Sequence, residues 1–196
     1  MAGRAVLPAI ALGLGLIFGG SLHSANLGLV LIKQLGSILL AVVVINLWEE
    51  TVWAGFVQTR LEARFNFVVA AVVTALPFAG VHVPLLFLDD QVSALSVLMG
   101  LAGLLILGIV VRLLMGVMMR AAADSVLAVG VLHQIFDANN NGGLVDSLLD
   151  GADAGDMTQL AAAVLAALVA AWLRWRRPGV FAKRHIPLRD SPPAVG

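Results

Sequence analysis

The sequence contains no cysteine and few charged residues, and both shortages narrow the kinds of protein it encodes. Without cysteine there are no disulfides, no thiolate nucleophile and no cysteine ligands for a metal. Only 12% of the 196 residues are charged and 60% are hydrophobic, whereas a soluble domain is about a quarter charged. We therefore predict an integral membrane protein. A net charge of zero and the lack of a basic stripe argue against a nucleic-acid partner.

Long apolar runs fill most of the sequence, and each is long enough to cross about 30 Å of hydrocarbon. They predict an all-α, polytopic transmembrane helical bundle of about six spans, forming a single domain over residues 1–196. The first run resembles a signal peptide, but it lacks a clean cleavage site after Leu22, so we expect it to stay attached as a helix. The runs cover residues 5–22, 27–59, 66–88, 92–119, 121–139 and 157–175.

Charge alternates between the predicted loops. One set of loops is basic, and residues 174–196 form a basic tail, which by the positive-inside rule places both termini in the cytoplasm. The other set is acidic, with Asp89 and Asp90 in one loop and "DSLLDGADAGD" (146–156) in another. The spacing of this last loop is not that of an EF-hand, so we interpret it as a solvated connection. The basic residues that mark the basic side of the predicted bundle, besides the tail, are Arg4, Arg60, Arg64 and Arg120.

A few ionisable residues lie inside the predicted spans, where an ionised side chain costs roughly 3 kcal/mol or more. Counted along the helices at 1.5 Å per residue, Glu49, His82 and His133 all lie roughly 16 to 24 Å from the basic end. They can therefore share one layer near the bilayer centre. His133 and Asp137 are four residues apart, which places both on one helix face.

Local spacing separates the roles of these residues further. Glu49 and Glu50 are adjacent, so they point about 100° apart on a regular helix and should have different tasks. Phe78 and His82 are also four residues apart, between two prolines that can bend the helix and turn its side chains toward a cavity. A single histidine in a membrane helix has an alternative, purely structural role, which is to form a hydrogen bond with a neighbouring helix.

Two kinds of chemistry fit this group of residues. Glu49, His82 and His133 form a plausible zinc ligand set, with a second carboxylate as general base. The same residues suit a metal-free mechanism, in which Glu and His deprotonate a water and the His133–Asp137 pair supports an oxyanion. The residues alone leave both open. The motifs H-E-x-x-H, G-x-S-x-G and G-x-G-D are absent, which sets aside those three intramembrane protease mechanisms.

Three motifs in order resemble the CPBP family, the CAAX proteases and bacteriocin-processing enzymes also called the Abi family. "EETVWAG" (49–55) is similar to the first motif, E-E-x-x-x-R-G. "FAGVH" (78–82) matches F-x-x-x-H, and "HQIFD" (133–137) matches H-x-x-x-N or D. The resemblance covers about residues 35–141, and each motif falls in its own predicted span.

The resemblance implies an intramembrane glutamate-type endopeptidase of a prokaryotic cell membrane, often described as a metalloprotease. Glu49 and His82 would activate the attacking water, His133 and Asp137 would stabilise the oxyanion, and Glu50 would support the site. The implied substrate is a peptide or a lipidated, for instance prenylated, protein that reaches the site from the membrane lipid. An alternative is a non-catalytic relative that acts as a bacteriocin-immunity or membrane binding protein. A small transporter is disfavoured because no inverted repeat is present.

The sequence departs from the first motif at Ala54, where the family has Arg. That Arg would lie four residues after Glu50, at the spacing of a helical ion pair. Arg112 is a candidate replacement, because it lies about 12 Å from Arg120 along its own helix, near the depth of Glu50. The alternative is that Arg112 extends along its helix toward the basic end of the bundle.

Overall fold

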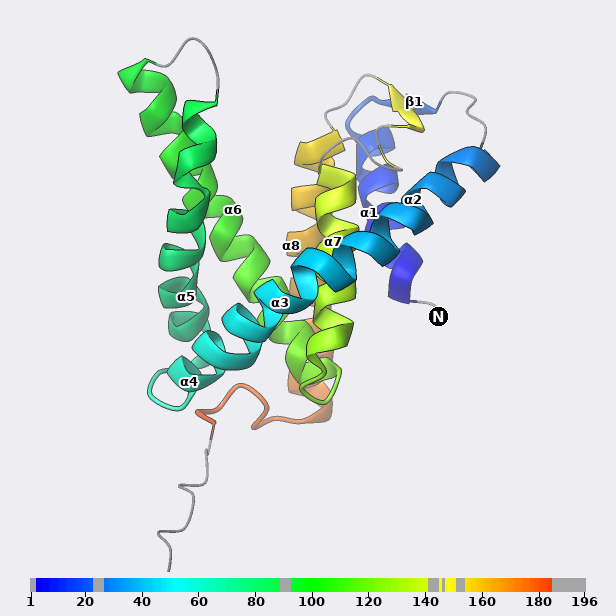
Figure 1. The fold of residues 1–196 in the computed structure, drawn as a ribbon. Coiled ribbons are helices and arrows are strands. Elements are labelled where there is room, and N and C mark those ends of the chain that lie inside the picture. Colours follow the sequence, from blue (N-terminus) through cyan, green and yellow to red (C-terminus); the bar gives the residue numbers. More distant parts are fainter. Residues whose placement is uncertain are drawn as a thin grey trace, which may run out of the picture.

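The computed structural model describes residues 3–22, 27–88, 93–140, 145, 147–150 and 154–184. Helices make up most of it, and the long helices from residue 67 onward run in alternating directions (Figure 1), which confirms the predicted all-α bundle. The elements are α1 (Gly3–Ile17), β1 (Ser21–Leu22), α2 (Leu27–Ala41), η1 (Val42–Asn46), α3 (Leu47–Glu50), η2 (Thr51–Gln58), α4 (Thr59–Glu62), α5 (Phe67–His82), η3 (Val83–Phe87), α6 (Ala94–Ala121), α7 (Val126–Asn140), β2 (Leu149–Asp150) and α8 (Ala154–Arg176).

Within the described residues, four helical segments are long and apolar enough to cross a membrane by length and composition, and the chain is an integral membrane protein. Two further apolar helices, in α1 and α7, are shorter than the sequence runs indicated, at 15 residues each, or about 22 Å. Gly19 ends the first run with φ +93, and Ala123 and Asp124 delay the start of α7 with positive φ. The four long segments are Leu39–Glu62, Phe67–Phe87, Ala94–Ala121 and Asp156–Arg176.

The glutamates lie on a continuous helical rod, residues 27–62, that crosses α7 obliquely (Figure 1). Two wide π-helical segments, η1 and η2, flank the single α-turn of α3 that carries Glu49 and Glu50. Thr51 and Thr59 donate hydroxyl hydrogen bonds to backbone carbonyls of this stretch, as hydrocarbon surroundings require. Because π-turns are rare and concentrate at functional sites, this local geometry indicates that the α3 region belongs to a functional site.

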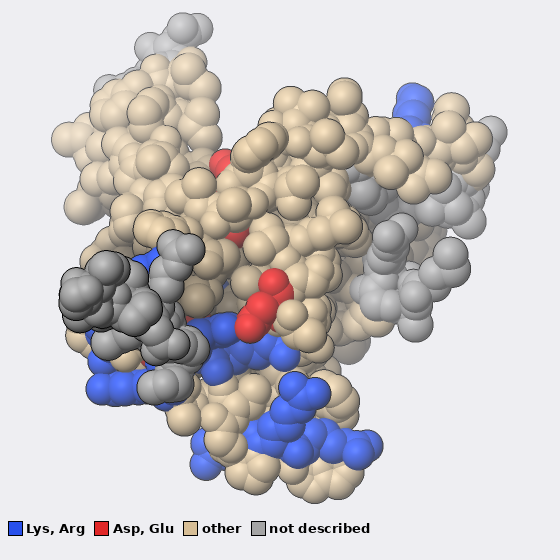
Figure 2. Space-filling view, turned by 60° about the horizontal axis from the view of Figure 1, so that its bottom comes forward, with Lys and Arg blue, Asp and Glu red and all other residues tan. Residues whose placement is uncertain are grey.

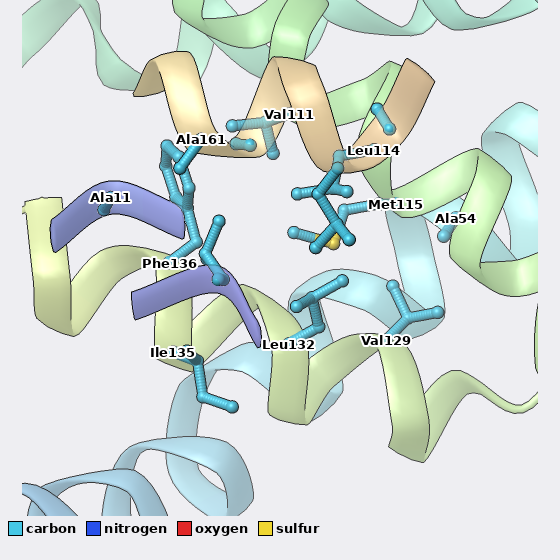
Figure 3. Packing of buried hydrophobic residues seen from close by; sticks show 14 of the residues in the cluster. Ala11, Ala54, Val111, Leu114, Met115, Val129, Leu132, Ile135, Phe136 and Ala161 are labelled. Carbon is cyan, nitrogen blue, oxygen red and sulfur yellow. The ribbon is translucent and has the colours of Figure 1, made fainter. Parts of the chain in front are cut away.

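The main hydrophobic core lies where α6, α7 and α8 meet. Figure 3 shows its side chains pointing inward from α6 and α7. Ala54 of η2 is 2% exposed and belongs to this core, so the position where the family has Arg is filled by apolar packing. Core members shown there include Leu114, Met115, Leu132 and Phe136.

Most lysine and arginine side chains gather at one end of the bundle, the basic end (Figure 2). There the C-terminal strap, residues 177–184, crosses the ends of α4 and α6. Arg184 donates to Glu62 Oε2 at 2.5 Å and to both carboxylate oxygens of Asp124 at 2.8 and 2.7 Å. Its backbone N–H also donates to the Glu62 carbonyl, at 2.9 Å. These bonds fix the strap to two separate elements of the bundle.

A second set of contacts fastens the middle of the strap. Arg120 of α6 donates to Glu62 at 2.6 Å and to the carbonyl of Val180. Phe181 packs on Phe67, with ring centroids 4.9 Å apart. The rest of the predicted basic tail, residues 185–196, and the predicted acidic residues Asp89, Asp90, Asp146 and Asp153 lie outside the described residues.

The strap should loosen in acid. Hydrogen bonds from Arg184 hold the pKa of Asp124 below its ordinary range, so the bound form of Asp124 is the carboxylate. The strap is therefore intact above the ordinary aspartate range, about pH 4, and weakens as the pH falls through the lowered pKa. A nitroxide on Ala182→Cys, the sole cysteine in the chain, should be immobilised at pH 7 and mobile in acid. With Asp124→Asn it should be mobile at pH 7 as well, and an immobile label in that variant would contradict the assignment.

Candidate functional site

A cavity of about 340 Å³ lies between α3, α5, α6 and α7, and all of its ionisable lining residues were predicted from the sequence. Glu49, His82, His133 and Asp137 line it together. The shared depth inferred from helix rise therefore corresponds to one actual space. The other lining residues are Ile45, Phe78, Ala79, Leu85, Leu104, Leu107, Gly108, Val111 and Phe136.

Glu50 faces away from the cavity and forms a buried ion pair with Arg112. Arg112 Nη2 lies 2.5 Å from Glu50 Oε1 and Nη1 lies 3.1 Å from Oε2, with both side chains 0% exposed. The predicted pairing of these residues is present, and the alternative, in which Arg112 extends toward the basic end, is wrong. Because an unpaired charge at this depth is costly, each residue makes the burial of the other tolerable.

Phe78 supports this ion pair from the side. The Arg112 guanidinium carbon lies 4.3 Å from the centre of the Phe78 ring, a cation–π contact that is stronger when desolvated. Trp53 meets the same ring edge-on, with centroids 5.8 Å apart. Phe78 therefore lies between the Arg112 guanidinium and the cavity, which Phe78 itself lines.

His133 connects the buried ion pair to the cavity. Its Nδ1 lies 2.7 Å from Glu50 Oε1 and 3.8 Å from Glu49 Oε2. Its Nε2 lies 3.5 Å from Asp137 Oδ1, across the predicted helical spacing of four residues. Glu50 thus contacts Arg112 and His133 at once, whereas Glu49 borders the cavity with 32% of its side chain exposed. The two adjacent glutamates occupy different environments, as predicted.

The tautomer of His82 follows from its one backbone contact. Its Nδ1 lies 2.7 Å from the carbonyl oxygen of Phe78. A carbonyl only accepts hydrogen bonds, so Nδ1 carries the proton and Nε2 of the neutral ring keeps its lone pair. The contact therefore fixes the tautomer of the neutral ring, in which Nε2 is the nitrogen that accepts a proton.

Sequence reasoning missed Asn46. Its Nδ2 donates to Asp137 Oδ2 at 3.0 Å, and the residue is 1% exposed. It lies four residues before Glu50 in the stretch "VVVINLWEE", and that helical spacing of a polar residue inside an apolar run was the available signal. Asn46 fixes Asp137 from the opposite side to His133.

Replacing Asn46 by Leu removes the donor that orients Asp137. For the reaction proposed below, the variant should have a kcat about tenfold or more lower, with a smaller change in KM. Asn139→Leu is the matched control. Asn139 is also a buried asparagine outside the cavity lining; its Nδ2 donates to the Ile135 carbonyl and its Oδ1 accepts from the Val145 N–H. Steady-state kinetics of both variants test the assignment, and equal losses of kcat in the two would show a merely structural role.

A zinc ion held by Glu49, His82 and His133 is one of the arrangements that the sequence leaves open. In the structure the Nδ1 atoms of both histidines face protein oxygens, which is the usual contact of a histidine that binds a metal through Nε2. No group of three or more His, Asp or Glu side chains suited to a metal ion occurs within the described part of the chain. If zinc is bound, Glu49, His82 and His133 would hold it and it would polarise the attacked carbonyl or water; the steps below are derived from the side chains alone.

The fold and the site together define a polytopic membrane protein with a cavity of carboxylates and imidazoles inside its helical bundle. The chain belongs to the type II CAAX prenyl endopeptidase Rce1-like family, whose sequence pattern matches residues 31–139. This match contains Asn46, all the cavity carboxylates and imidazoles, and Arg112, and it agrees with the predicted range of 35–141. Comparisons with curated proteins and with solved structures gave no match. The helix α8 and the strap lie outside the matched residues.

Proposed function

We propose that the protein is an intramembrane endopeptidase that hydrolyses a peptide bond in a prenylated CAAX-type protein or peptide. The observation that carries the proposal is the cavity that Glu49, His82, His133 and Asp137 line together, in a chain of a CAAX prenyl endopeptidase family. Both the acid–base groups and an apolar wall are present there. The basic end is proposed to face the cytoplasm.

In this mechanism Glu49 and His82 activate water. Glu49 is the partly exposed carboxylate, and His82 offers the lone pair of Nε2, so either accepts a proton from a water in the cavity. The resulting hydroxide attacks the peptide carbonyl carbon, and the proton passes to the leaving amine. The oxyanion forms beside His133, which acts as a hydrogen-bond donor. Glu50 holds this imidazole at Nδ1, and Nε2, which lies 3.5 Å from Asp137 Oδ1, donates to the oxyanion.

The rest of the cavity suits a lipidated substrate. Leu104 and Leu107 of α6 and Phe136 of α7 face the same space as the polar groups. A prenyl chain buried against such side chains gains about 25 cal/mol per Å² of apolar surface. Binding of the lipid would hold the adjacent peptide bond near Glu49, which is the proximity effect expected of an endopeptidase.

The non-catalytic alternative loses its main support in this structure. The sequence feature that favours a non-catalytic relative is Ala54, which takes the place of the arginine of the first motif. Arg112 supplies a cation to Glu50 from another helix, which supports a site that is compensated for the missing arginine.

Mass spectrometry of protein termini in the host membrane tests the proposal. Cells producing the wild type are compared with cells producing Glu49→Gln at the same level. We expect a small set of new C-termini, at or near lipidated cysteines, that is present only with the wild type. Identical sets of termini from the two strains, with both proteins folded in the membrane, would contradict a peptidase.

A further inference from the structure

A second cavity, of about 670 Å³, lies at the basic end of the bundle between α5, α6 and α8. It shares no lining residue with the catalytic cavity, and one of its walls belongs to α8, outside the residues that match the family. We call it the leaflet groove. Its walls are apolar, with Phe67, Leu113 and Val117 on one side and Ala163, Ala167 and Ala170 of α8 on the other.

The leaflet groove has the depth of one half of a bilayer. Along α8 its lining runs from Ala163 to Arg174, which at 1.5 Å per residue is about 16 Å. The hydrocarbon core of a bilayer is about 30 Å thick. The groove therefore extends from the membrane surface to near the midplane, as one acyl chain of a phospholipid does.

A single cation marks the polar end of the groove. Arg174 lines it there, and within the described residues no ion pair or hydrogen bond joins Arg174 to another group. Two cations at the same end have other partners, because Arg184 binds Glu62 and Asp124 and Arg176 lies over the Trp175 ring. Arg174 is thus left with an exposed positive charge above an apolar channel.

The same turn of α8 carries the features of a membrane interface. Trp172 and Trp175 flank Arg174 and are exposed, and tryptophan is enriched at the level of lipid head groups. A cation at this level attracts anionic lipid. Charge, depth and apolar lining therefore coincide at one place on the surface.

We propose that the leaflet groove binds an anionic phospholipid of the surrounding leaflet, with one acyl chain between α6 and α8 and the phosphate at Arg174. Phe181 of the strap closes the lining near this end, so the bound lipid also contacts the C-terminal strap. The proposal concerns a site separate from the peptidase chemistry and does not depend on it.

The test is native mass spectrometry of the full-length protein, extracted in detergent and titrated with phosphatidylglycerol or with phosphatidylcholine of the same chains. The wild type should retain phosphatidylglycerol more strongly. Arg174→Gln should weaken that binding about fivefold, the effect of one cation near an anionic surface. Arg176→Gln is the matched control, since it removes a charge from the same helix end outside the groove, and it should bind like the wild type.

A second pair of variants tests the apolar part of the site. Ala167→Phe fills the groove from an exposed position and should reduce binding of both lipids, whereas Ala171→Phe, outside the lining, should not. Equal affinity of the wild type for the two lipids would overturn the proposal. So would equal losses in Arg174→Gln and Arg176→Gln.

Discussion

Replacement of Glu49 by Gln is expected to lower the rate of peptide cleavage by about 10²- to 10⁴-fold, the usual contribution of a general base. Gln has nearly the same shape but does not accept a proton, so the cavity keeps its form and loses its base. The assay is cleavage of a farnesylated CAAX peptide by the protein reconstituted in lipid vesicles. Asp156→Asn, a carboxylate change in the first turn of α8, is the control and should leave the rate unchanged.

His82→Gln should produce a loss of the same order. If Glu49 and His82 act on one water, the double variant should be little worse than either single variant, because groups that act as a unit are not additive. Losses that multiply in the double variant would show that the two residues act in separate steps. Unchanged melting temperatures in all three variants are needed to assign the losses to chemistry.

Arg112→Leu is expected to destabilise the protein by roughly 3–5 kcal/mol, because it leaves the buried Glu50 carboxylate without its cation. The double variant Glu50→Leu/Arg112→Leu removes both charges and should regain most of that stability, since apolar residues of similar size often replace a buried pair at little cost. Activity should not return with it, because Glu50 also contacts His133.

Unfolding in mixed micelles with increasing SDS measures these changes, and the double-mutant cycle isolates the energy of the pair. Arg64→Leu removes an exposed cation in the turn that follows α4 and serves as the matched control, with little expected effect. A single Arg112→Leu variant as stable as the wild type would show that the Arg112–Glu50 pair does not hold the site together.

The relocation of this arginine has a structural consequence. In the family motif the cation would lie on the same helix as Glu50, one turn away. Here it comes from α6, 62 residues further along the chain, so the ion pair also joins the oblique rod to α6. Formation of the site therefore depends on the packing of these two elements and not on local helix geometry alone.

Hydropathy and spacing were sufficient to predict much of the site. Long apolar runs give the bundle because hydrocarbon requires helices, and constant helix rise gives the common depth of Glu49, His82 and His133. The same argument led to Arg112. Spacing of four residues correctly related His133 to Asp137, since both lie on one regular helix.

The sequence did not predict features that depend on contacts between distant segments. Asn46 and Asp137 are 91 residues apart, and neither carries a local signal for the other. The π-helical turns around α3 and the shortening of α1 and α7 come from packing and from positive φ at a few residues. The strap was not predicted for the same reason, because the hydrogen bond between Arg184 and Glu62 joins residues 122 positions apart.

The most direct test of the central claim is the product analysis of the wild-type protein in lipid vesicles with a farnesylated CAAX peptide and its unprenylated twin. The account predicts hydrolysis of one bond near the farnesylated cysteine. Cleavage of the unprenylated peptide should be much slower, and cleavage should be lost in both Glu49→Gln and His82→Gln. An intact farnesylated peptide, or cleavage that persists in both variants, would contradict it.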